Sequence, residues 1–196
     1  MSGRRSGGTG PAARAQPAEL LTALPLVDAV LDAHAGAIGR DLTAYRHHVY
    51  RVVNLAIRFG RGDAAWFERL QIAAAFHDLG IWTAHTFDYL EPSVTDATGF
   101  LASTGRTAWT PAIAETIREH HKVTACRGPA AGLAEPFRRA DWTDVSLGAR
   151  RFGLAWMDYR VILRAWPDEG FHWRLIQLTA GRWRQHPLSP LPMVRW

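Results

Sequence analysis

Cysteine and long apolar runs are scarce in this sequence. Its single cysteine, Cys126, cannot form a disulfide within the chain, which is consistent with a reducing cytoplasm. No apolar stretch approaches the roughly 20 residues that a helix needs to span a bilayer, so we expect no membrane-spanning helix. The sequence also lacks a P-loop, a glycine-rich dinucleotide loop, an alternating β pattern and an internal repeat, which argues against nucleotide-binding α/β folds.

Acidic residues are absent from residues 1–18. Arg4, Arg5 and Arg14 in this segment contribute three of the five net positive charges of the chain. The segment is rich in Gly, Ala and Pro, so we expect a disordered basic tail. The Arg4-Arg5 pair lacks the hydrophobic region of a twin-arginine signal. Because no nucleic-acid-binding motif accompanies the tail, nucleic acid is not an expected partner. A cytoplasmic location is predicted, in line with the single cysteine.

Helical periodicity dominates residues 19–196, and a hydrophobic content of 47% supports a single domain with a real core. We therefore expect an all-α fold. Pro25 and Pro111 are helix-start signals, and Asp41 and Asp63 are suited to N-cap positions. The predicted helical segments are 19–37, 42–59, 64–79, from Ser93 or Asp96 to near Gly105, 110–122, 135–148, 154–166 and 170–184. The first is started or interrupted at Pro25, and 135–148 is opened by Glu135-Pro136. The predicted loops are 80–91 and 126–134, and the proline-rich segment 186–196 is predicted to be extended and to pack back onto the domain.

The adjacent pair His77-Asp78 ends an apolar helix in the run LQIAAAFHDLGIW, and Gly80 is expected to stop that helix. At 100° per residue, His77 falls within the apolar stripe of Leu70 and Ala73, and Asp78 lies on its flank. An ionised carboxylate buried there needs a partner, because an unpaired buried charge is very costly. A neutral imidazole beside it makes a divalent metal ion a suitable partner.

Further segments place His or Asp on other predicted helices: YRHHVYRV (45–52), REHHKV (118–123) and RRADWTDV (138–145). His48 borders the core face of its helix, whereas His47 points nearly opposite. Asp141 lies on the inner side of the last of these helices, and Asp144, one turn further on, is the alternative ligand there. Helix bundles build metal sites from side chains on facing helices in this way.

His120 and His121 are predicted to lie on either side of the inward stripe formed by Ile113 and Ile117. Neighbouring side chains on one helix diverge by about 100°, so we expect that these two histidines do not bind one ion together. One of them would bind a second ion or a phosphate group while the other hydrogen-bonds the backbone. The remaining histidines are interpreted as surface or structural residues: His34, His47, His172 and His186.

The order of these residues resembles that of the HD-domain superfamily of metal-dependent phosphohydrolases. His48 is followed by Arg51 and Val52 in an H-x-x-R-V pattern, and Asp141 follows the small residue Ala140. The resemblance covers about residues 40–150, the motif core, while 151–196 would supply the C-terminal helices and the extended tail. The segments TFDYLEPS (86–93) and HPLSPLPMVRW (186–196) are similar to a subgroup of small bacterial HD proteins with no assigned substrate.

The resemblance implies an HD-type helical bundle with a divalent metal ion held by His48, His77, Asp78 and Asp141. Ligand type does not choose among Mn²⁺, Fe²⁺, Co²⁺, Ni²⁺, Zn²⁺ and Mg²⁺. A second metal is an open alternative, because dinuclear members usually supply two well-separated further histidines. The candidates for that role here are His85, close behind the pair, and the adjacent His120 and His121.

The expected function is metal-dependent hydrolysis of a small phosphorylated substrate, either a phosphomonoester or a nucleotide, by metal-activated water. Asp78 would also orient the attacking water, and His120 or His121 would protonate the leaving oxygen or hold the phosphate. Positive charge at the mouth of the site could come from Lys122, Arg127, Arg138 and Arg139. The alternatives are a dinuclear-iron oxygenase of the HD type and a metal-binding regulatory domain without turnover.

Overall fold

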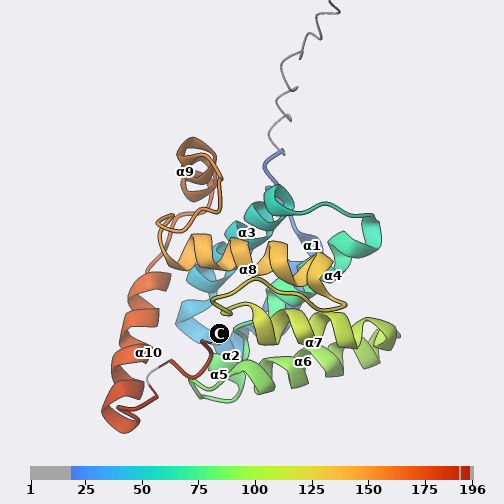
Figure 1. Ribbon diagram of the computed structural model, residues 1–196. Helices are drawn as coiled ribbons and strands as arrows, with labels where there is room; N and C mark the ends of the chain where they lie inside the picture. The colour runs from blue at the N-terminus through green and yellow to red at the C-terminus, as the bar shows by residue number, and fades with distance from the viewer. Residues whose placement is uncertain (1–18, 190, 195–196) are drawn as a thin grey trace, which may run out of the picture.

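The computed structural model describes residues 19–189 and 191–194. This part of the chain folds into helices and contains no strand, which confirms the all-α prediction (Figure 1). None of its helices is both long and apolar enough to cross a membrane. The basic tail predicted over residues 1–18 lies outside the described residues.

Most helix starts agree with the local signals. Pro25 and Pro111 occupy the first turns of their helices, and the Asp63 carboxylate accepts a hydrogen bond from the Trp66 amide at 2.8 Å. Asp41 precedes its helix as predicted but does not cap it; its carboxylate accepts from Trp82 Nε1 instead. The elements are α1 (Pro25–Ala33), α2 (Ala35–Ile38), η1 (Gly39–Asp41), α3 (Leu42–Phe59), α4 (Ala64–Phe76), α5 (Gly80–Thr83), α6 (Leu90–Ser103), η2 (Thr107–Trp109), α7 (Thr110–Glu119), α8 (Ala131–Val145), α9 (Trp156–Ala165) and α10 (Phe171–Gln185).

Several predicted boundaries are wrong: α4 ends at Phe76 instead of residue 79, and α7 ends at Glu119 instead of residue 122. The predicted loop 80–91 contains the short helix α5, and α6 begins at Leu90 instead of Ser93 or Asp96. Helix α8 begins at Ala131, so Pro136 lies inside the helix and does not open it. A proline inside a helix leaves the carbonyl four residues earlier without its usual donor. Here the indole of Trp66 donates to that carbonyl, Gly132 O, at 3.0 Å, so a contact distant in sequence offsets the defect.

The helices pack around one hydrophobic core. Helix α3 makes its most extensive contacts with α8, and α7 packs against α4, α6 and α8. Figure 1 shows α8 crossing in front of α3, with α6 and α7 side by side and α10 along one flank. After α10 the chain turns back and buries Met193, as predicted for the proline-rich segment, whereas Leu191 stays exposed. The arrangement brings the middle of α3 and α8 close to the C-terminal ends of α4 and α7.

Candidate metal centre

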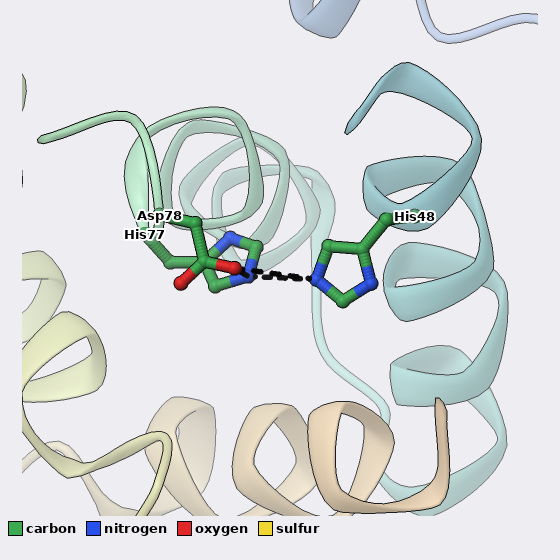
Figure 2. Close-up of side chains that lie close together, drawn as sticks. All are labelled: His48, His77 and Asp78. Carbon is green, nitrogen blue, oxygen red and sulfur yellow. Dashed lines mark hydrogen bonds and ion pairs between the residues drawn. The ribbon is translucent and has the colours of Figure 1, made fainter. Parts of the chain in front are cut away.

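The predicted site residues lie on two helices and in the turns that follow two others, and they meet in the interior. His48 lies in the middle of α3, and Asp141 lies in α8. His77 and Asp78 follow α4 in a turn, and His120 directly follows α7. Figure 2 shows His48 reaching across from α3 toward His77 and Asp78. The four side chains proposed as ligands, together with His120, are at most 3% exposed, so water contributes little to their solvation.

Four side-chain atoms converge on one small space. His48 Nε2 lies 3.0 Å from His77 Nε2. Asp78 Oδ2 lies 3.2 Å from His77 Nε2 and 3.7 Å from His48 Nε2. Asp141 Oδ1 lies 3.5 Å and 3.8 Å from the same two nitrogens. The ligand atoms of His48, His77 and Asp78 lie within 4.8 Å of one another, so this buried group could hold a metal ion.

The hydrogen bonds on the far side of each imidazole set its tautomer. His48 Nδ1 lies 2.8 Å from Asp144 Oδ2, His77 Nδ1 lies 2.8 Å from Ala74 O, and His120 Nδ1 lies 2.6 Å from Ile117 O. These oxygens only accept, so each Nδ1 carries the proton and each Nε2 presents a lone pair. Burial lowers the pKa of His48 to about 4 despite the opposing effect of Asp144, so this ring is neutral at pH 7.

Two lone pairs that face each other 3.0 Å apart repel, and a cation between them would turn this repulsion into coordination. The carboxylates also lack partners. Asp78 Oδ1, His120 Nε2 and both carboxylate oxygens of Asp141 are buried and accept or donate no hydrogen bond within the described residues. Buried polar groups of this kind are rare without an unseen ion or water. The donor set therefore fits a divalent metal ion.

Burial raises the pKa of Asp141 well above its usual value, and the nearby carboxylates of Asp78 and Asp144 add to this effect, with His120 opposing it. Burial also acts to raise the pKa of Asp78, but His77 and His120 outweigh it and hold that pKa low. When no cation is bound, Asp78 therefore carries more of the negative charge of these two carboxylates than Asp141 does. A bound divalent cation would favour the ionised form of both.

A second group of ligands lies beside the first. His120 Nε2 is 3.4 Å from Asp78 Oδ1, and His121 Nδ1 is 3.2 Å from Asp141 Oδ2. The ligand atoms of Asp78, His120 and His121 lie within 4.8 Å of one another. Asp78 therefore belongs to both groups, with one oxygen facing each.

The prediction that His120 and His121 diverge too far to share an ion is wrong. Their ring centroids are 4.0 Å apart. The divergence of about 100° between neighbouring side chains holds only within a helix. It does not apply here, because α7 ends at Glu119 and both histidines lie in the turn that follows. Tyr89 holds His121 from the other side, with its hydroxyl 2.8 Å from Nε2. A phenol can donate or accept, so this bond is compatible with either tautomer of His121.

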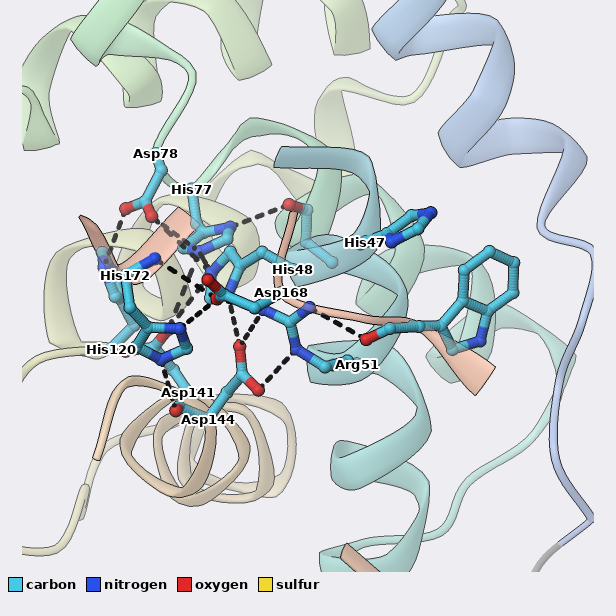
Figure 3. Close-up of polar contacts among 12 residues, drawn as sticks. His47, His48, Arg51, His77, Asp78, His120, Asp141, Asp144, Asp168 and His172 are labelled. Carbon is cyan, nitrogen blue, oxygen red and sulfur yellow. Dashed lines mark hydrogen bonds and ion pairs between the residues drawn. The ribbon is translucent and has the colours of Figure 1, made fainter. Parts of the chain in front are cut away.

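Asp144, the alternative ligand, is engaged behind the centre. Its carboxylate accepts from Arg51 Nε at 2.7 Å and Arg51 Nη2 at 2.9 Å, as well as from His48. Figure 3 shows this network on the side of His48 that faces away from His77. Phe171 at the start of α10 stacks on the His48 ring at 4.0 Å between centroids, and His172 Nε2 contacts Asp144 O at 2.9 Å. Such a carboxylate orients a metal-binding histidine through its second nitrogen.

The remaining predicted residues either have other partners or are exposed. His85 is exposed in the loop before α6, and His47 Nδ1 contacts Pro167 O at 2.8 Å. The predicted phosphate-binding cations are each paired with a glutamate: Lys122 with Glu119, and Arg138 and Arg139 with Glu135. Arg127 is exposed.

Sequence reasoning missed Tyr89, Phe171 and the role of Asp144 behind His48. The available signal for Tyr89 was its position within TFDYLEPS, a segment that carries part of the family resemblance but had no assigned structural role.

Comparison of the chain with family models, with curated proteins and with solved structures finds no match.

Proposed function

We propose that the protein is a metal-dependent phosphohydrolase of the HD type, in which water attacks a small phosphate ester. The observation that carries the proposal is the set of imidazole lone pairs and unpartnered carboxylate oxygens that face one buried space. His48, His77, Asp78 and Asp141 would hold the metal. The ion would supply Lewis-acid chemistry, acidifying water and stabilising negative charge on a phosphoryl oxygen.

The side chains of the second group suit the proton transfers of hydrolysis. A water molecule loses a proton as its oxygen bonds to phosphorus, the P–O bond to the leaving alcohol breaks, and that alcohol gains a proton. Asp78 Oδ1, which has no hydrogen-bond partner, can orient the water. His121 is the most exposed member of the cluster, with 14% of its side chain accessible, so it is placed to meet the leaving oxygen. Burial, with His120 adding to the effect, lowers the pKa of His121 well below its usual value, so this neutral ring would pass on the proton that the attacking water loses.

Metal analysis of the purified chain, followed by phosphatase assays with each candidate metal, tests the proposal. We expect bound metal and hydrolysis of phosphomonoesters that depends on it. Full metal occupancy without turnover on a broad phosphoester panel would contradict it and favour a regulatory metal-binding domain.

A dinuclear-iron oxygenase is the second candidate, and two observations favour it. Asp78 directs its two oxygens toward two different sets of histidines, so it could contribute a ligand to each of two ions. The pairing of Lys122, Arg138 and Arg139 with glutamates also leaves none of them as free positive charge for a phosphate. Two bound irons per chain and consumption of O₂ with an organic substrate would distinguish this activity from hydrolysis.

A further inference from the structure

A cavity of about 250 Å³ adjoins the candidate metal centre. It is lined by the loop before α6, the turn after α7, one side of α8, one side of α10 and the returning C-terminal segment, and it is partly open to solvent. Residues from each of these parts contribute to its lining: Tyr89, His121, Trp142, Leu175, Thr179 and Met193. Five segments of the chain therefore contribute to one partly open cavity.

His121 and Tyr89 belong to both the cavity and the metal centre. The Tyr89 hydroxyl contacts His121 Nε2, while His121 Nδ1 lies 3.2 Å from Asp141 Oδ2. His121 has 14% of its side chain exposed, whereas Asp141 has none. A molecule approaching the centre through this cavity would meet His121 first.

The walls of the cavity are apolar. Aromatic and aliphatic side chains predominate, and no Lys, Arg, Asp or Glu belongs to the described lining. The Trp142 indole nitrogen is already engaged, because it donates to Lys122 O at 3.0 Å. A ribose or a second phosphate would lose its hydrogen bonds to water here without equivalent replacements, which is costly.

We propose that this cavity receives an apolar group of the substrate, an aromatic ring or a branched aliphatic chain, while the reacting group sits at His121. The inference rests on the proposed function and narrows its substrate class to small phosphomonoesters of apolar alcohols, in place of nucleotides. The size is adequate, since cavities of roughly 150 Å³ hold benzene. Trp142 and Tyr89 offer aromatic surfaces to such a ring.

The kinetic test compares benzyl phosphate, methyl phosphate and adenosine monophosphate on the metal-loaded full chain. We expect kcat/KM for benzyl phosphate to exceed the other two by at least about tenfold, because a hydrophobic pocket discriminates at about that level per added apolar group. Thr179→Trp would fill the cavity and bring the benzyl-to-methyl ratio close to one. Gln177→Trp is the matched control, since it introduces the same indole at an exposed position of α10 and should leave the ratio unchanged.

A binding measurement separates this inference from the proposed function. Ligand-observed ¹⁹F NMR with 4-fluorobenzyl alcohol needs no turnover. We expect binding to the wild type and the Gln177→Trp variant and loss of binding in Thr179→Trp. If the alcohol binds in this pattern while no phosphate ester is hydrolysed, the apolar subsite stands and the phosphohydrolase proposal falls. If the alcohol does not bind, or binds equally to Thr179→Trp, the apolar subsite is refuted whatever the phosphatase result.

Discussion

Asp141 and Asp144 are the same residue type, one turn apart on α8, and both are fully buried. Asp144 accepts from Arg51 and His48, and these contacts outweigh the effect of burial and hold its pKa well below the usual value. Asp141 has no hydrogen bond on either oxygen, and burial raises its pKa. The difference separates a structural carboxylate from a candidate ligand, because one has its cation within the fold and the other faces a space where a cation would fit.

The largest expected effect concerns Asp78, which, like Asp141, has a buried oxygen without a hydrogen-bond partner. We expect Asp78→Ala to abolish metal binding and hydrolysis, because Asp78 is one of only two carboxylates among the described residues that face the first group. The apo variant should remain folded but unfold at a somewhat lower temperature than the apo wild type, because the interactions with His77 and His120 that hold the Asp78 pKa low are lost. Metal content and thermal unfolding are measured on the same preparation.

His47→Ala is the matched control for that experiment. Its ring contacts Pro167 O on the other side of α3, so it should keep its metal. Equal loss of metal from both variants would show that the first group is not the metal site.

The second expected effect concerns His120 and His121. We expect both alanine variants to retain the first metal, and at least one to lose turnover by about 10²–10⁴-fold, the range for general acid catalysis. Metal content and rate are determined on the same preparations. Loss of all metal from either variant would place that histidine in the primary site, and full rates in both would mean that the acid lies elsewhere.

The third expected effect is a loss of stability when Asp144, the carboxylate paired with Arg51, is removed. Asp144→Ala leaves the buried Arg51 guanidinium without its carboxylate, and breaking a buried pair in this way costs about 3–5 kcal/mol. Metal affinity should also fall by about 10–100-fold, because His48 loses the group that orients it. Urea unfolding of the apo protein and metal titration measure the two effects.

The exposed Asp88→Ala variant is the control for Asp144→Ala and should change neither quantity. Unchanged stability in Asp144→Ala would show that the Arg51 pair is compensated by solvent, and the contrast with Asp141 would then lose its basis.

The smallest effect is a pH dependence on the same helix. Burial raises the pKa of Glu135, but hydrogen bonds from Arg138, the Cys126 amide and Arg139 outweigh it and lower that pKa to about 2. A carboxylate with a depressed pKa contributes stability above its unfolded pKa of about 4.3, and this contribution disappears as the pH falls toward 2. Urea unfolding of the metal-free wild type and Glu135→Gln should therefore differ at pH 7, and the difference should shrink below about pH 4.3 and vanish only as the pH falls through about 2. A difference that stays constant with pH would contradict the assignment.

Local sequence signals predicted much of the helical framework because they act within one turn. Pro25, Pro111 and Asp63 mark helix starts through their own backbone or side-chain geometry. The start of α8 could not be predicted, because the defect at Pro136 is offset by Trp66 on another helix. The same limit explains His120 and His121, whose approach depends on where α7 ends.

The sequence by itself determined the helical class and the inward phase of His48, His77 and Asp141, because hydrophobic periodicity sets which face of each helix is buried. Only the tertiary structure decided which buried carboxylate has a cation, since Arg51 reaches Asp144 and not Asp141 across the α3–α8 interface. It also decided the shared position of His120 and His121 and the cavity beside them. These features depend on distances between segments far apart in the chain, and periodicity within one segment carries no information about them.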